Sequence, residues 1–191
     1  MTAQETAEKI QKIAARLFIQ KGYTATSMRE IAAEVGIGKA TIYYHFPDKE
    51  AIASALIHQT FSDMKEALTM MRAEQDPRQR IKVAVTSSVD YLLDSADMIS
   101  VLRREVAGSR DLMQHEFKEF SLEYIQLLAD AIRRGTEQGI FRPVEPVAAA
   151  RVLLTMIQGT FAMVYMSGIR NQTNGHSASA ILDIFFHGID A

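Results

Sequence analysis

Cysteine is absent from this chain of 191 residues, which excludes disulfide bridges and thiolate metal sites. The same absence fits a reducing cytoplasm. Because Glu5, Glu8 and Lys9 place charges near its start, we expect no secretory signal and therefore a cytoplasmic protein. Apolar residues make up 48% of the chain, enough to fill the core of one large domain or two small ones.

A convincing membrane-spanning run is also lacking. One segment, residues 152–169, carries no formal charge between Arg151 and Arg170, but it is barely of spanning length. It also contains Gln158, Thr155 and two glycines. We therefore expect a buried core or interface helix here, and no contact with a membrane.

The motifs of common catalytic sites are missing as well. The sequence has no nucleophile elbow, no glycine-rich phosphate loop and no histidine pair at i and i+4. Four scattered histidines lack the spacing of metal ligands: His58, His115, His176 and His187. We therefore expect no enzymatic activity, no catalytic residues, no cofactor and no metal ion.

Sustained strand alternation is absent, and every long segment has the periodicity of a helix. Starts such as Asp76-Pro77 and stops such as Gly22, Gly36 and Gly139 divide the chain into elements. These signals predict an all-α protein of nine helices, at about residues 3–21, 27–36, 39–46, 48–71, 76–92, 97–107, 111–138, 145–166 and 177–187.

The most informative segment is residues 26–50, which indicates two short helices, a turn and the start of a third helix. Ser27 and Glu30 form an S-x-x-E capping box. Two short helices joined by a few residues that include glycine are typical of a helix-turn-helix unit. Ile42 and Phe46 lie one turn apart and would fix the second helix, which leaves its other side for solvent or DNA.

The side chains on that other side suit a DNA backbone and base edges. Lys39, Lys49 and the tyrosine hydroxyls are suited to phosphate contacts, whereas Thr41 and Tyr43 or Tyr44 are suited to base edges. An ordinary solvated helix whose tyrosines pack on neighbours is the alternative. Charge adds weak support, because residues 1–49 carry a net +2 and the remainder carries −4.

The run from Leu17 to Ile52 resembles the TetR family of transcriptional repressors. The resemblance rests on Phe18, Gly22-Tyr23, Thr26, Ile31-Ala32, Gly36, Lys39-Ala40-Thr41, Tyr43-Tyr44-His45-Phe46 and Lys49-Glu50. It implies a major-groove surface and a phosphate contact at Lys49. Gly38 departs from the serine that is frequent there, although glycine is tolerated as an N-cap. The DNA-binding residues we expect are Ser27, Arg29, Gly38, Lys39, Ala40, Thr41, Tyr43, Tyr44, His45 and Lys49.

The resemblance also implies two domains with different functions. Residues 1–47 would form a three-helix DNA-binding domain, and residues 48–191 a larger helical domain for effector binding and dimerisation. The last two helices are apolar almost all round, and Gly159 would let helices approach, so we expect a homodimer through them. A monomeric core is the alternative.

Aromatic residues and methionines in the middle of the chain suit a pocket for a hydrophobic or amphipathic molecule. A plain core is the alternative for each of them, and the existence of a pocket is implied mainly by the resemblance. Arg103 and Arg104 would suit an anionic group, or simply a solvated helix face. The expected ligand-binding residues are Phe61, Met64, Leu68, Met98, Leu102, Phe117, Phe120, Tyr124, Phe161 and Tyr165.

The sequence therefore predicts a ligand-responsive repressor. It would bind palindromic double-stranded operator DNA as a homodimer and be released by a small, hydrophobic effector. The alternatives are an all-helical carrier or enzyme with a non-functional DNA-binding module, and a helical protein–protein adaptor.

Overall fold

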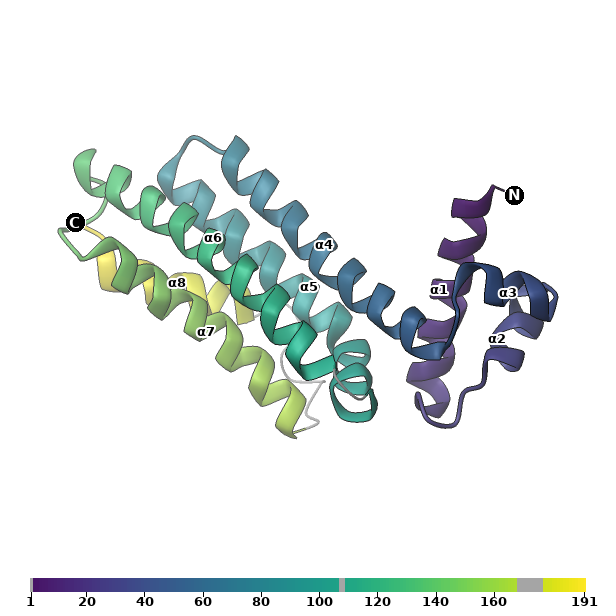
Figure 1. Ribbon diagram of the computed structural model, residues 1–191. Coiled ribbons are helices and arrows are strands. Elements are labelled where there is room, and N and C mark those ends of the chain that lie inside the picture. Colours follow the sequence, from purple (N-terminus) through teal and green to yellow (C-terminus); the bar gives the residue numbers. More distant parts are fainter. Residues whose placement is uncertain (1, 107–108, 168–176) are drawn as a thin grey trace. The chain divides into compact units, whose positions relative to one another are not determined.

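The computed structural model describes residues 2–106, 109–167 and 177–191. Within these residues the secondary structure is helical, apart from one isolated antiparallel bridge between Phe141 and Asp190. The helices, in chain order (Figure 1), are α1 Ala3–Lys21, α2 Met28–Val35, α3 Lys39–His45, α4 Lys49–Ala73, α5 Pro77–Glu105, α6 Ser109–Glu137, α7 Pro146–Ser167 and α8 Ser177–Ile189. The predicted all-α class is confirmed.

The prediction of nine helices is wrong by one over the described ranges, where there are eight. Residues 76–92 and 97–107 were expected to form two helices, but α5 runs without a break from Pro77 to Glu105. The residues between the two expected helices, 93–96, contain neither proline nor glycine, so nothing forces the helix to end there. Ala107, the expected end of the second helix, lies outside the described residues.

The chain packs as two compact units, of which the first comprises Met1–Phe61 and Asp97–Glu116. In this unit α1, α2 and α3 pack against one another. The apolar stripe of α1 supplies Ile10, Ala14 and Phe18, and the other two helices supply Ile31 and Ile42; all five side chains are buried. Helical spacing thus directs one face of each short helix into a shared core.

Local capping fixes where α2 begins and ends. The Glu30 amide N–H donates to Ser27 Oγ at 3.2 Å, and the Ser27 amide N–H donates to Glu30 Oε2 at 2.9 Å. This is the predicted capping box. At the other end Gly36 has φ 81° and ψ 32°, a left-handed conformation that glycine adopts without the penalty of a Cβ atom. The turn into α3 follows directly.

The second unit comprises Ser62–Ala96 and Phe117–Ala191. Its core contains Tyr124, which is fully buried and whose hydroxyl accepts from Ser88 Oγ at 3.0 Å and donates to the Ala84 carbonyl at 2.9 Å. Burial raises the pKa of this tyrosine. Helix α8 packs on α7. Over the residues described, no helix has both the length and the apolar composition that crossing a bilayer requires.

Candidate DNA-binding surface and ligand hollow

Helix α3 buries one side and exposes the other. Ile42 is fully inaccessible and Phe46 is buried, as their spacing predicted. Tyr44 is 80% exposed and Tyr43 is 44% exposed, while His45 is half-buried. The exposed side chains and backbone of Gly38, Lys39, Ala40, Thr41, Tyr43 and Tyr44 form one continuous stretch, which we call the reading surface.

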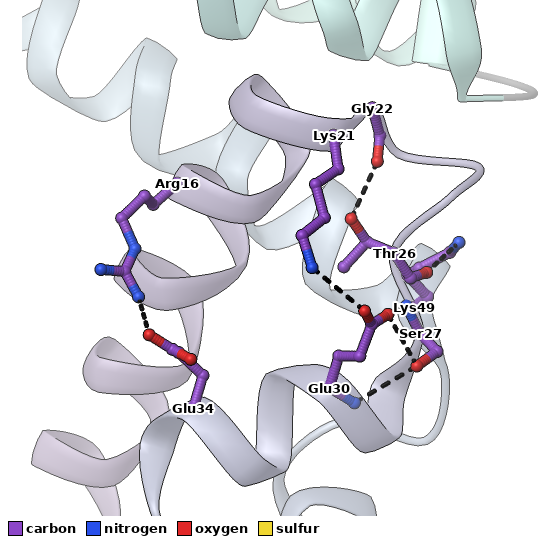
Figure 2. Close-up of polar contacts among 8 residues, drawn as sticks. All are labelled: Arg16, Lys21, Gly22, Thr26, Ser27, Glu30, Glu34 and Lys49. Atoms are coloured by element: carbon purple, nitrogen blue, oxygen red, sulfur yellow. Dashed lines mark hydrogen bonds and ion pairs between the residues drawn. The ribbon is translucent and has the colours of Figure 1, made fainter.

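The two expected DNA-binding residues at the start of α2 differ in their surroundings. Arg29 is exposed. The Ser27 hydroxyl takes part in the cap and also donates to Glu30 Oε2 at 3.0 Å (Figure 2). The Ser27 amide N–H, followed by Lys21, holds the pKa of Glu30 below its usual value. Ser27 therefore serves α2 as a cap in this conformation.

Ion pairs within the first unit use several of its basic side chains. Arg16 pairs with Glu34 at 2.5 Å and Lys21 pairs with Glu30 at 3.1 Å, which ties α1 to α2 (Figure 2). All four side chains are about half exposed (43–49%), so solvent screens the pairs and they contribute little to stability. Their effect is to balance charge locally, which leaves the exposed Lys39 as the cation of the reading surface.

Lys49, at the start of α4, directs its ammonium group into the protein. Its Nζ donates to the carbonyl of Thr26 at 2.6 Å (Figure 2). It also donates to the carbonyl of Tyr23 at 2.5 Å and, more weakly, to that of Thr24 at 3.4 Å. It also lies 4.2 Å from the centre of the Tyr23 ring. Burial lowers the pKa of this lysine. The phosphate contact stays a prediction, and in this conformation the ammonium group is engaged with backbone carbonyls.

A hollow of about 470 Å³, partly open to solvent, lies within the second unit. It is bordered by α4, α5 and α6. Apolar and aromatic side chains supply most of its lining, and two carboxylates, two serine hydroxyls and one tyrosine hydroxyl supply the polar part. The lining residues are Asp63, Met64, Glu66, Ala67, Met70, Ser87, Ser88, Tyr91 and Phe120.

Two of the ten expected ligand-binding residues line this hollow, namely Met64 and Phe120. The others are distributed over the structure. Leu68 and Tyr124 are buried and Phe117 is half-buried in the second unit; Phe61 and Leu102 are buried and Met98 is half-buried in the first unit. The side chains of Phe161 and Tyr165 lie outside the described part of the structure.

The hollow also contains residues that the sequence analysis did not select. On α4 they are Asp63, Glu66, Ala67 and Met70, spaced at i, i+3, i+4 and i+7 along one helix face. A search for a mixed stripe of acidic, small and sulfur-containing side chains would have found them. A search for aromatic and aliphatic residues alone selects the core instead, because a helix buries its most apolar face.

Comparisons with known proteins agree with this geometry. The family described as "Bacterial regulatory proteins, tetR family" matches residues 10–56, and "Tetracyclin repressor-like, C-terminal domain" matches residues 74–162. The uncharacterized HTH-type transcriptional regulator YvkB of Bacillus subtilis is 29% identical over 156 residues, which cover 82% of this chain and 81% of YvkB. The HTH-type transcriptional repressor DhaR of Mycobacterium sp. strain GP1 is 24% identical over 160 residues, which cover 82% of this chain and 80% of DhaR.

A solved structure supports the assignment over the full length. A transcriptional regulator from Saccharomonospora viridis, in complex with choline, matches with a TM-score of 0.76 and 26% identity, covering 98% of this chain and 99% of that one. The first match ends within α4 and the second begins just before α5, and together they span most of the chain. The chain therefore belongs to the TetR family of ligand-responsive, DNA-binding transcriptional repressors.

Proposed function

We propose that this repressor binds a palindromic operator as a homodimer, with one reading surface in each of two major grooves. The observation that carries the proposal is the exposure of Tyr43, Tyr44 and Lys39 around a helix fixed from behind by Ile42. Two such helices about one turn of DNA apart, or a multiple of it, contact successive grooves. DNA binding is assigned to residues 1–47, and effector binding and dimerisation to residues 48–191, in the cytoplasm.

Selection from a pool of random duplex DNA tests this proposal. We expect a palindromic sequence to be enriched, and Tyr44→Ala or Thr41→Ala to reduce discrimination at one base position by about 1–3 kcal/mol in each half-site. Ile19→Ala is the control, because Ile19 is a large exposed side chain (44%) on α1, outside the reading surface. No enriched sequence at low ionic strength would contradict DNA reading and favour a carrier function.

Exposed apolar residues on the last two helices support the dimer. Ile184 on α8 is 64% exposed and Val152 on α7 is 56% exposed in the single chain. Burial against a second copy would remove this area from water. We expect Ile184→Asp to give monomers in sedimentation velocity and to weaken operator binding. Leu122→Asp is the control, since Leu122 on α6 is also exposed (52%). Dimers that survive Ile184→Asp unchanged would rule out α8 as the interface.

The hollow in the second unit is the proposed effector site. Its lining fits a small hydrophobic or amphipathic molecule whose polar part meets Asp63, Glu66 or a serine hydroxyl. Such a ligand would favour a conformation in which the two reading surfaces no longer match successive grooves, so operator affinity falls. Reciprocity then requires operator DNA to weaken effector binding by the same factor.

Filling the hollow tests this assignment. Ala67 lines it and is half-buried, so Ala67→Phe should occupy its space. We expect compounds that raise the melting temperature of the wild type in a library screen to lose that effect on Ala67→Phe, while operator binding persists. Ala73→Phe is the control, because Ala73 is an exposed residue of the same helix. Compounds that stabilise all three proteins equally would place the effector elsewhere.

A further inference from the structure

The loop that leads from α1 into α2 is held by hydrogen bonds of its own. We call residues 22–26 the entry loop. The Thr26 hydroxyl donates to the Gly22 carbonyl at 2.8 Å, and the Thr26 amide donates to the Tyr23 carbonyl at 3.2 Å. Gly22 has φ 90°, where a side chain is rarely tolerated. Because Ser27 follows at once as the cap of α2, the loop sets the direction in which α2 and α3 leave α1.

Lys49 holds the carbonyl side of the entry loop. Its ammonium group donates to the carbonyls of Tyr23, Thr24 and Thr26, the contacts given above. A cation is suited to this task because several backbone oxygens converge on one point. Figure 2 shows Lys49 reaching across to Thr26, beside the cap at Ser27.

Glu105 holds the amide side of the same loop. It is the last residue of α5, and its Oε2 accepts from the Thr24 amide N–H at 3.2 Å, across 81 residues of sequence. The carboxylate lies so close to the loop that a Cβ atom on Gly22 would stand 2.9 Å from Oε2. Its other oxygen accepts from Arg104 at 3.0 Å, and the side chain is 19% exposed. The entry loop is therefore bonded on its carbonyl side to the ammonium group of Lys49, from α4, and on its amide side to the carboxylate of Glu105, from α5.

We propose that Glu105 is a positioning residue for DNA binding, which fixes the entry loop and through it the orientation of α2 and α3. The inference rests on the proposed operator binding. Helix α5 contributes residues 77–96 to the second unit and residues 97–105 to the first. Any rearrangement that moves or frays the end of α5 withdraws the acceptor from Thr24, so the residue couples the state of α5 to the reading surface.

The sign of the effect separates this role from plain electrostatics. Removing an acidic side chain makes a protein less repulsive to DNA, so Glu105→Ala should bind tighter if only charge matters. Positioning predicts the opposite, a loss of about tenfold in operator affinity, the size expected for one hydrogen bond to a charged group. Asp94→Ala is the matched control, since Asp94 is an exposed acid of the same helix.

The experiment compares Glu105→Ala, Glu105→Gln and Asp94→Ala on the duplex that the wild type selects. Glutamine keeps an oxygen acceptor for the Thr24 amide, so Glu105→Gln should retain most of the affinity. Hydrogen exchange should rise in residues 22–35 of Glu105→Ala, while the second unit exchanges as in the wild type. A merely structural role would instead raise exchange throughout and lower affinity equally in both Glu105 variants.

Two outcomes would overturn the proposal. One is a Glu105→Ala protein that binds the selected duplex as tightly as the wild type, or tighter. The other is an equal loss of affinity in Glu105→Ala and Glu105→Gln. Failure of operator binding itself is distinguishable, because the wild type would then select no duplex.

Discussion

Binding of DNA should depend on salt differently after removal of Lys39, which lies in the reading surface, and of Lys49, which lies outside it. Lys39 is exposed in the first turn of α3, and its Nζ lies 6.0 Å from the centre of the Tyr43 ring. Lys49 is half-buried and its ammonium is bonded to three backbone carbonyls. Only Lys39 is therefore presented as a free-standing charge to a DNA phosphate. The changes to compare are Lys39→Ala and Lys49→Ala.

The magnitude follows from counterion release. Each phosphate contact contributes about 0.9 to the slope of log affinity against log salt, and a homodimer carries each contact twice. Lys39→Ala should therefore lower the slope by about 1.8. Over a fourfold rise in salt, the affinity of the wild type then falls by about 12-fold more than that of the variant. Lys49→Ala should keep the wild-type slope and weaken operator binding by the same factor at every salt concentration. It should also reduce the free energy of unfolding by about 1–3 kcal/mol.

Fluorescence anisotropy with the selected duplex, at several concentrations of potassium chloride, gives the slopes, and urea unfolding gives the stabilities. Lys118→Ala, an exposed lysine on α6, is the control and should change neither. The reasoning is refuted if Lys49→Ala lowers the slope by about 1.8 while Lys39→Ala leaves it unchanged. That result would mean that Lys49 leaves its carbonyl partners when DNA binds.

Three further predictions concern stability. Gly135→Ala should reduce the free energy of unfolding by about 1–3 kcal/mol in urea, because the new Cβ atom would overlap the Phe141 ring, and this clash outweighs the usual helix gain of about 1 kcal/mol. A more stable variant would contradict the close packing of Phe141 on Gly135. Tyr124→Phe should cost about 1–3 kcal/mol in the same assay, since Ser88 loses a buried partner, and a neutral result would contradict that bond. Glu30, whose pKa the capping bonds lower, should stabilise the fold fully above about pH 4.5 and lose this contribution as pH falls through its lowered pKa; melting curves of the wild type and Glu30→Gln should therefore converge in acid.

The elements that the sequence predicted best are those whose signals are local. Ser27 and Glu30 are three residues apart, and the structure joins them as expected. Gly36 ends α2 by adopting a backbone conformation that few other residues accept. Ile42 and Phe46 needed only helical spacing to be placed in the core. Such features depend on a few neighbouring residues, so one sequence contains all that determines them.

The predicted break between residues 92 and 97 is wrong because packing with distant residues, and not local sequence, decides whether α5 continues there. Aspartate and serine are common N-cap residues, and the segment contains Asp94, Ser95 and Asp97. They stay inside a helix when the apolar side chains next to them on that helix are buried. Here Ala96, Val101 and Leu102 are buried on the same helix, so packing continues across the candidate break. Tertiary burial overrides a local preference of a few tenths of a kcal/mol per residue.

The hollow could be anticipated only in part, because apolar character does not distinguish a core from a cavity. Leu68 and Tyr124 are of residue types that often line pockets, but both are buried in the core. Met70 was not selected, yet it lines the hollow and is exposed. What decides between these roles is whether a neighbouring helix fills the space beside a side chain. That depends on how α4, α5 and α6 are spaced, which helical periodicity within one segment does not encode.

Lys49 and Glu105 show where inference from a motif stops. The family resemblance places Lys49 at a position that implies a phosphate contact, but it does not say what else the ammonium can reach. In the structure it converges on the Tyr23 and Thr26 carbonyls, while Glu105 approaches the same loop from a helix that no local pattern connects with it. An acid beside a DNA-binding module lowers DNA affinity if it acts only as a charge, and it raises affinity if it holds the module in shape. The residue type is the same in both cases, so the sign of its effect is decided by the backbone N–H groups of the entry loop to which it is bonded.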